Sequence, residues 1–253
     1  ISSNPDLGNV DGLRGLTRVE GSLTIASNAV LEDLDGLRYL TLTGRGVTID
    51  DNDLITELDG LVRLAEVGGN LTISANDRLY DLQGLNNLGS LAGTLTFASN
   101  PALSKIDGFE RLSSLGGSLS VTSNSALQSI EGFNSIETID GTLSIYNNDQ
   151  LLGMSLGGFS QLSTIGSLSV SNNDVLEHVD GLRALEVISG NLAVNNNSRL
   201  TSCKALAYVL KLGSIGGQIS INSNPNNCNS STQILNSISP PSQPEIIEAV
   251  SVN

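Results

Sequence analysis

The sequence predicts a mainly β, single-domain protein, a β-solenoid of about nine stacked coils. Two observations support this prediction. Asn recurs every 24 residues through most of the 253-residue chain, and the residues between successive Asn repeat one pattern of apolar and glycine positions. The recurring residues are Asn4, Asn28, Asn52, Asn76, Asn100, Asn124 and Asn148, followed at slightly longer steps by Asn173, Asn197 and Asn224.

Each period reads N-x-x-L-x-x-L-D-G-L-x-x-L-x-x-I-x-G-x-L-x-I-x-x. The two glycines indicate short turns and argue against one long helix. The closing L-x-I segment has the period of two that is typical of a strand. One coil cannot bury its own apolar side, so successive coils must stack, about 4.8 Å apart if their strands pair in parallel.

The Asn positions are expected to stack at a turn inside the solenoid. There, each amide would donate to a carbonyl of one neighbouring coil and accept an N–H from another. The alternative, an exposed Asn row that reads a sugar, is the weaker one, because a strictly kept position usually faces the core.

The chain divides into two parts in this interpretation. Residues 1–229 form the leucine-rich solenoid, with a C-terminal cap that begins at about residue 198, and residues 230–253 form a tail or an added strand. The segment CKALAYVLKL, residues 203–212, is expected to be a short helix of the cap. Cys203 and Cys228 lie about one coil apart, which predicts a disulfide, with two buried thiols as the alternative.

Outward positions of the strands form a row of small hydroxyl side chains. Its members are Thr24, Thr48, Thr72, Thr96, Ser120, Ser144 and Ser169. We predict that this flat face binds a glycan or protein ligand, the alternative being an exposed sheet stabilised by cross-strand hydroxyl pairs. An ice-binding face is a further alternative, which Asp50 and Tyr146 disfavour because they interrupt the regular array.

A second row is acidic. It contains Asp11, Asp35, Asp59, Asp107, Glu131 and Asp180. The favoured interpretation is a turn cap, in which each carboxylate accepts a backbone N–H and nearby Arg residues neutralise the charge. The alternative is a string of weak Ca²⁺ sites, at Asp35 and Asp59 for example, with about one carboxylate per coil.

Composition excludes several classes of function. The formal net charge of −14 disfavours binding to nucleic acid or to anionic membrane surfaces, and no apolar run is long enough to insert into a membrane. The single histidine, His178, has no nucleophile motif near it in the sequence. We therefore expect neither an enzyme nor a cofactor.

The stretch GNLTISANDRLYDLQGLNNLGSLAGTLTF, residues 69–97, resembles the receptor L-domain type of leucine-rich repeat. The resemblance covers roughly residues 4–224. That type occurs in growth-factor receptor ectodomains, fungal cell-wall glycoproteins and bacterial surface proteins. It implies a cell-surface or cell-wall protein, although the disulfide-rich flanks of the receptors are missing, which argues against hormone-type binding.

An extracellular location also agrees with three N-x-[ST] sequons, at Asn70, Asn196 and Asn229, and with the predicted disulfide. The start at Ile1 predicts a removed signal segment or a fragment. The expected function is adhesion or ligand recognition through the Ser/Thr face. The structural alternative is a subunit of an extracellular filament or coat that self-associates through solenoid ends and tail.

Overall fold

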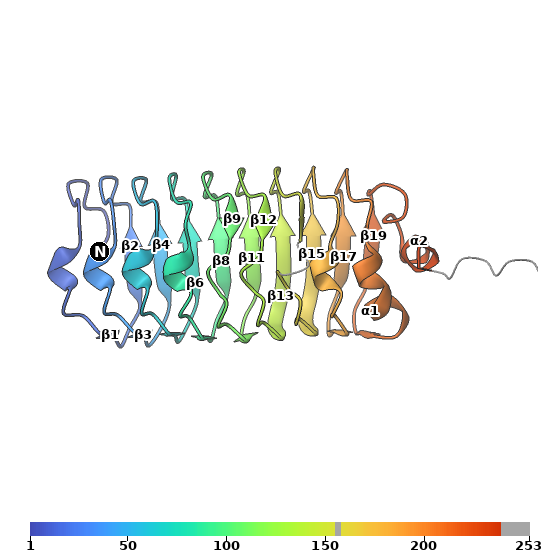
Figure 1. Ribbon diagram of the computed structural model, residues 1–253, viewed down its shortest axis with the longest axis horizontal. Coiled ribbons are helices and arrows are strands. Elements are labelled where there is room, and N and C mark those ends of the chain that lie inside the picture. The colour runs from blue at the N-terminus through green and yellow to red at the C-terminus, as the bar shows by residue number, and fades with distance from the viewer. Residues whose placement is uncertain (155–157, 239–253) are drawn as a thin grey trace, which may run out of the picture.

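The computed structural model describes residues 1–154 and 158–238, which form an elongated, mainly β solenoid with parallel strands (Figure 1). Its central row contains nine strands that lie side by side, so the chain makes about eight turns between the first and the last. These strands are β2 (Leu23–Ala26), β4 (Val47–Asp50), β6 (Leu71–Ser74), β8 (Leu95–Ala98), β11 (Leu119–Thr122), β13 (Thr138–Tyr146), β15 (Thr164–Ser171), β17 (Leu192–Asn195) and β19 (Ile219–Asn222). The predicted β-solenoid is thus confirmed.

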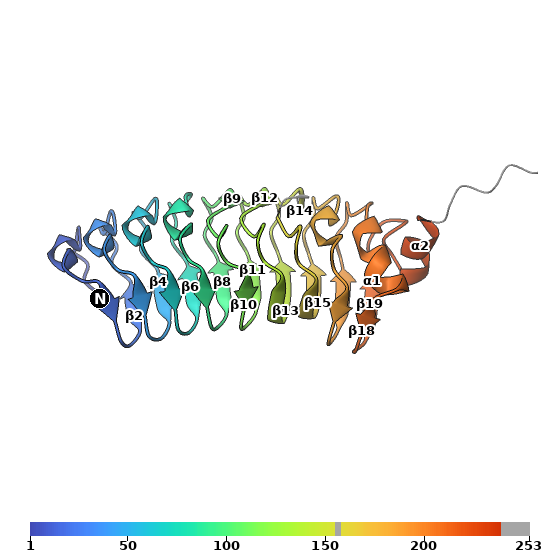
Figure 2. The same cartoon turned by 60° about the horizontal axis from the view of Figure 1, so that its bottom comes forward.

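A second row of two-residue strands precedes the central row and belongs to the same sheet. It consists of β1 (Arg18–Val19), β3 (Leu42–Thr43), β5 (Glu66–Val67), β7 (Ser90–Leu91), β10 (Ser114–Leu115), β16 (Val187–Ile188) and β18 (Ser214–Ile215). The longer strands β13 and β15 pair with both rows. Both rows end up on one broad side of the solenoid, as the turned view in Figure 2 shows.

The opposite side carries single 3-10 turns in most coils. They are η1 (Asp11–Leu13), η2 (Asp35–Leu37), η3 (Asp59–Leu61), η4 (Gln83–Leu85), η5 (Asp180–Leu182) and η6 (Lys204–Leu206). In the middle coils the short strands β9 (Lys105–Ile106), β12 (Ser129–Ile130) and β14 (Gly153–Met154) form a three-stranded sheet. The side opposite the main sheet is therefore made of turns at the two ends and of strands in the middle.

The core is a continuous stack of the apolar positions of the repeat. The strand residues Ile49, Ile73 and Val121 are fully buried, as are the corresponding residues of most other coils. Phe109, Phe133 and Phe159 occupy one core position in successive coils, with ring centroids 5.1 Å and 5.4 Å apart. Each coil thus covers the apolar face of the next.

Asn side chains form the predicted buried ladder. The Nδ2 group of Asn52 donates to the carbonyl of Ile25 in the preceding coil at 3.0 Å, and its Oδ1 accepts the backbone N–H of Asn28 at 3.3 Å. The residue before each ladder Asn has a positive φ, for example 54° at Asp51 and 52° at Ala75. This left-handed residue turns the chain sharply, and the amide satisfies the backbone groups that the turn leaves unpaired.

The repeated glycines have a different cause from the one the sequence indicated. No glycine in residues 1–154 and 158–238 has a positive φ, so a special turn conformation does not require them. Instead, a Cβ at Gly60 or Gly84 would overlap the backbone carbonyl of the preceding coil, at Leu34 and Leu58 respectively. These glycines are needed because neighbouring coils approach closely.

A helical segment follows η6 at the C-terminal end. It contains α1 (Ala207–Lys211), which lies inside the predicted helix, and α2 (Ser231–Asn236), which contacts α1. Cys203 and Cys228 are joined by a disulfide and have Cα atoms 5.6 Å apart. The Asn ladder ends here, because Asn229 Oδ1 accepts the N–H of Asn224 at 3.1 Å. The predicted tail or added strand, residues 230–253, is described only as far as residue 238, and this part contains α2. Its remainder, residues 239–253, lies outside the described residues.

Candidate functional site

The predicted ligand-binding residues occupy one row across the central strands. Thr24 lies opposite Thr48 in the strand register, Thr48 opposite Thr72, and Thr72 opposite Thr96. The row continues through Ser120, Ser144 and Ser169, which are paired in the same register. The structure thus brings together all seven residues, which are far apart in the sequence.

The row lies on an exposed, flat surface because its strands alternate strictly. In β6, Leu71 and Ile73 are buried, whereas Thr72 and Ser74 are partly exposed. The same alternation holds in β4, β8 and β11. Parallel neighbours are about 4.8 Å apart, so the hydroxyl groups form an array with one repeat distance along the solenoid axis.

Two side chains beside the row interrupt its uniformity. Tyr146 is 42% exposed and lies in register with Thr122 and Ser171 on the neighbouring strands. Asp50 accepts a hydrogen bond from the hydroxyl of Ser74. The hydroxyl row is interrupted at Ala193, which follows Ser169 in the register, and resumes at Ser220. The face therefore offers hydroxyls along most of its length and an amphipathic aromatic ring on β13, the sixth of its nine central strands.

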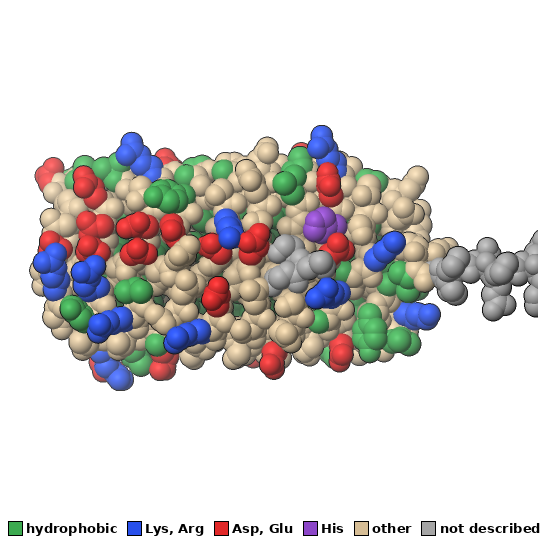
Figure 3. Space-filling view, viewed as in Figure 1, with side chains coloured by type: hydrophobic (Ala, Val, Ile, Leu, Met, Phe, Trp, Pro, Cys, Tyr) green, Lys and Arg blue, Asp and Glu red, His purple; other side chains and the backbone are tan. Residues whose placement is uncertain are grey.

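The acidic row lies on the other side of the solenoid, over the 3-10 turns (Figure 3). The predicted capping role is wrong for Asp11 and Asp35. The N–H of Asp35 is instead accepted by Asp33 Oδ1 at 2.9 Å, and that of Asp11 by Asn9 Oδ1 at 3.2 Å. A side chain two residues before the 3-10 turn can reach the N–H of the first turn residue more easily than that residue's own side chain can. Asn9, Asp33 and Asp81 therefore cap the turns that begin two residues after them.

Asp11 and Asp35 of the acidic row make ion pairs instead. Arg14 Nη2 is 2.8 Å from Asp11 Oδ1, and Arg38 Nη2 is 3.4 Å from Asp35 Oδ1. Arg63 lies over the ring of Tyr39, with its guanidinium carbon 4.7 Å from the ring centroid. The predicted neutralisation by Arg thus holds at Arg14 and Arg38, whereas Arg63 contacts an aromatic ring.

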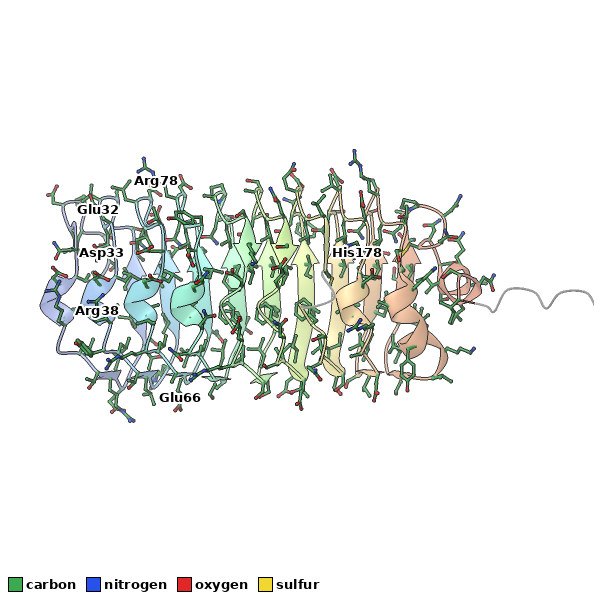
Figure 4. The ribbon with its side chains drawn as sticks, viewed as in Figure 1. Glu32, Asp33, Arg38, Glu66, Arg78 and His178 are labelled. Atoms are coloured by element: carbon green, nitrogen blue, oxygen red, sulfur yellow. A yellow bond between two sulfur atoms is a disulfide. The ribbon has the colours of Figure 1, made fainter. Side chains whose placement is uncertain are left out.

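Charge crowding is greatest around Glu57. Burial raises the pKa of Glu57, and the neighbouring carboxylates Asp59, Asp81, Asp35 and Asp33 raise this pKa further. Figure 4 shows Asp33 and Arg38 projecting from this side of the molecule. Within the described part of the chain, no three His, Cys, Asp or Glu side chains are grouped so as to hold a metal ion, at Asp35 and Asp59 or elsewhere.

A polar hollow of about 260 Å³ lies where the 3-10 turns give way to strands. Lys105 lines this hollow, with its Nζ 3.0 Å from Glu131 Oε2 and 3.2 Å from Asp107 Oδ2. Hydrogen bonds to Glu131 and then to Asp107 raise the pKa of Lys105. This cluster was not predicted, although the sequence contains a signal for it: Lys105 replaces the carboxylate in the row that contains Asp33 and Asp81.

His178 lies on the same side of the solenoid, and its backbone pairs with Gly153 and Ser202 through single parallel β-bridges. A Cβ at Gly153 would overlap its imidazole ring, so the ring lies directly over that glycine. Its Nδ1 is 3.4 Å from Asp180 Oδ2. These contacts are those of a packed surface residue in the coil stack.

The three sequon asparagines are exposed. Asn70 Oδ1 accepts the N–H of Thr94 at 2.9 Å, beside the Ser/Thr face, and Asn229 closes the Asn ladder. In residues 1–154 and 158–238, no helix is long and apolar enough to cross a bilayer. No protein-family model matches the chain, and searches among curated proteins and solved structures found no match either.

Proposed function

We propose that the chain is a non-enzymatic, extracellular recognition protein of a cell surface or cell wall, and that its Ser/Thr face binds an extended glycan or protein ligand. The register of the seven hydroxyl side chains from Thr24 to Ser169 carries this proposal. Six steps of about 4.8 Å give a binding surface of roughly 29 Å.

Such a surface suits a repeating polar ligand. Each hydroxyl can donate one hydrogen bond and accept others, so the array supplies both types of partner at regular intervals. Tyr146 adds a ring on which the apolar face of a sugar can lie, while its hydroxyl stays in water. A long ligand makes several weak contacts at once, which raises the overall affinity.

Two further features support the extracellular location. The disulfide between Cys203 and Cys228 is a bond that persists in oxidising compartments. The exposed sequons at Asn70, Asn196 and Asn229 are accessible to glycosylation in the secretory route.

The proposal is tested by binding to a glycan array with the double variant Thr72→Arg and Thr96→Arg. Two long side chains in the middle of the row would cover the neighbouring hydroxyls, so we expect binding to be lost. The control variant places Arg on the opposite side, at Val62 and Gln83, which are both exposed. Equal binding by wild type and the Thr variant, with matching circular dichroism spectra, would contradict the proposal.

A further inference from the structure

The last strand of the sheet has an open edge. Among the described residues, β19 pairs only with β17, and β18 pairs only with β16. In the inner coils, each central strand has a parallel neighbour on both sides. The C-terminal edge of the sheet is therefore able to accept one more strand.

Inward side chains at this edge are uncovered. Ile219 is 48% exposed, whereas Leu192 at the same position of the preceding coil is fully buried. Ile215 is only partly buried, although Ile188, its register partner in β16, is fully buried. An apolar strand laid on β18 and β19 would remove this surface from water.

The backbone pattern shows which groups at the edge are open. In an inner coil, Val47 N–H donates to Asn70 and Asp51 N–H to Ser74, both in the following coil. The equivalent donors at the last strand are the N–H groups of Ile219 and Ser223, and β17 is not on that side of β19. A following strand would satisfy them.

The chain itself contains a segment with the required pattern. Residues 245–253 read E-I-I-E-A-V-S-V-N, and residues 214–222, which contain β18 and β19, read S-I-G-G-Q-I-S-I-N. Aligned without a gap, Ile246 matches Ile215 and the sequence V-S-V-N matches I-S-I-N. The tail differs from the last coil at Ile247 and Glu248, which align with two glycines. Side chains are accepted at these positions elsewhere, because Glu20 stands at the first of them and Arg45 at the second in earlier coils.

We propose that residues 245–253 add to this edge of their own chain as a parallel strand. Val250 then lies opposite Ile219, Ser251 opposite Ser220, and Val252 opposite Ile221. The apolar side chains of Ile246 and Val250 cover Ile215 and Ile219, and Val252 packs on Ile221, which is already buried. Ser251 extends the hydroxyl row. The sheet side of the solenoid is thus closed by the tail, while α1 and α2 lie at the same end of the solenoid.

The other sheet edge is a poorer partner for the tail. Its strand β2 already pairs with the first residues of the chain, because Ile1 N–H donates to the Thr24 carbonyl at 2.8 Å and Ser3 N–H to the Ala26 carbonyl at 3.0 Å. The C-terminal edge of the sheet, at β18 and β19, is also within reach of the tail. The 12 residues from Ile238 to Val250 span up to roughly 40 Å when extended.

The test is a disulfide cross-link between register partners in the full chain. Ser220→Cys combined with Ser251→Cys places two thiols on adjacent parallel strands, about 4.8 Å apart between Cα atoms and within the range of a disulfide. We expect an intrachain bond, detected by peptide mapping and by an unchanged monomer mass. Thr24→Cys combined with Ser251→Cys is the matched control and is expected to give no cross-link.

Three outcomes would overturn the proposal. Absence of the bond in the Ser220/Ser251 variant, with a wild-type circular dichroism spectrum, shows that the strand does not add. An interchain bond in that variant shows that the tail pairs with another molecule. A cross-link in the Thr24/Ser251 variant, whether within or between chains, shows that the tail uses the first edge of the sheet.

Hydrogen exchange supplies an independent readout. Val250→Lys combined with Val252→Lys puts charges on the inward side of the tail strand and is expected to reduce protection of the Ile219 and Ser223 amides at least about 10-fold. Ser251→Lys, which points outward, is expected to leave their protection unchanged. Equal exchange in the wild type and in both variants would contradict the added strand.

Discussion

Asn124 shows how one side chain holds neighbouring coils together. Its Nδ2 group donates to the carbonyls of Phe97 and Thr122, both at 3.1 Å, and its Oδ1 accepts the N–H of Asn100 at 3.1 Å. The side chain is fully buried, so water cannot replace these partners. A short amide is needed here because it combines donors and an acceptor at one position.

Replacing Asn124 by Ala is expected to be strongly destabilising. The change leaves the buried N–H of Asn100 without its acceptor, which costs about 1–3 kcal/mol. It also removes one hydrogen bond from each of the two carbonyls, of which Thr122 still accepts the N–H of Ser99, and each lost bond costs about 0.5–1.5 kcal/mol. We expect the free energy of unfolding, measured in urea, to fall by at least about 3 kcal/mol. Asn226→Ala, at an exposed position, is the control and should change it by less than about 0.5 kcal/mol.

Ala75 gives the opposite prediction, because its backbone is strained by its Cβ. Its φ of 52° lies in the left-handed region, where an L-residue is disfavoured by about 1 kcal/mol or more relative to Gly. Ala75→Gly should therefore raise the midpoint of denaturation, and Ala75→Val should lower it. Ala65→Gly, in a coil position without positive φ, should be mildly destabilising; an equal effect at both sites would contradict this explanation.

Turns and strands on the acidic side go with different side chains at two positions of the coil. The coils with 3-10 turns η1, η2 and η4 carry Asn9, Asp33 or Asp81 as a cap. The middle coils carry Lys105, Ser129 and Gly153 at that position, and Phe in place of Leu in the core. They form β9, β12 and β14 instead. The coils of η5 and η6 lack the cap as well and still form 3-10 turns, but they keep Leu in the core. The larger ring is therefore the difference that the three strand-forming coils share.

The glycine in the 3-10 turns η1 to η5 allows a direct test of coil spacing. A Cβ at Gly84 would overlap the carbonyl of Leu58, whereas a Cβ at Gly12, the same position in the first coil, would meet nothing within 4 Å. Gly84→Ala should therefore lower the free energy of unfolding by about 1–3 kcal/mol or more, because overpacking forces the coils apart. Gly12→Ala should have little effect; a similar loss at both sites would indicate a turn requirement instead.

The whole molecule has an uneven distribution of charge. Its formal net charge is −14, and the carboxylates around Glu57 are gathered over the turns, opposite the hydroxyl face. Like charges in such a cluster repel one another, and salt screens this repulsion over distances of about 10 Å. The Ser/Thr face is thus separated from the most acidic part of the surface.

Glu57→Gln tests this charge crowding. Because the folded protein raises the pKa of Glu57 above 4.5, the folded state binds the proton more tightly than the unfolded state, so the contribution of Glu57 to stability falls as pH rises from 4.5 through the folded pKa. The variant should lack this loss and be more stable than wild type at pH 7. Urea denaturation across this pH range should show a difference in the free energy of unfolding between variant and wild type, and this difference should shrink in high salt. Glu186→Gln, at an exposed position, is the control.

Much of the fold and of the hydroxyl face follows from the sequence alone. A spacing of 24 residues places Thr72 beside Thr48 and Thr96 once coils stack in register, so a linear repeat becomes a row in space. The same periodicity predicts the buried Asn ladder and the stacked apolar core. These features depend only on periodicity and on which side of a strand each residue faces.

The tertiary structure decided what depends on distances between coils. It showed that Gly60 and Gly84 are required by close approach and that Asp33, rather than Asp35, caps its turn. It also placed Lys105 between Asp107 and Glu131 and left Ile219 uncovered. A repeat assigns residues to the same row, but contacts between adjacent rows depend on the path of the backbone around the coil, which periodicity does not specify.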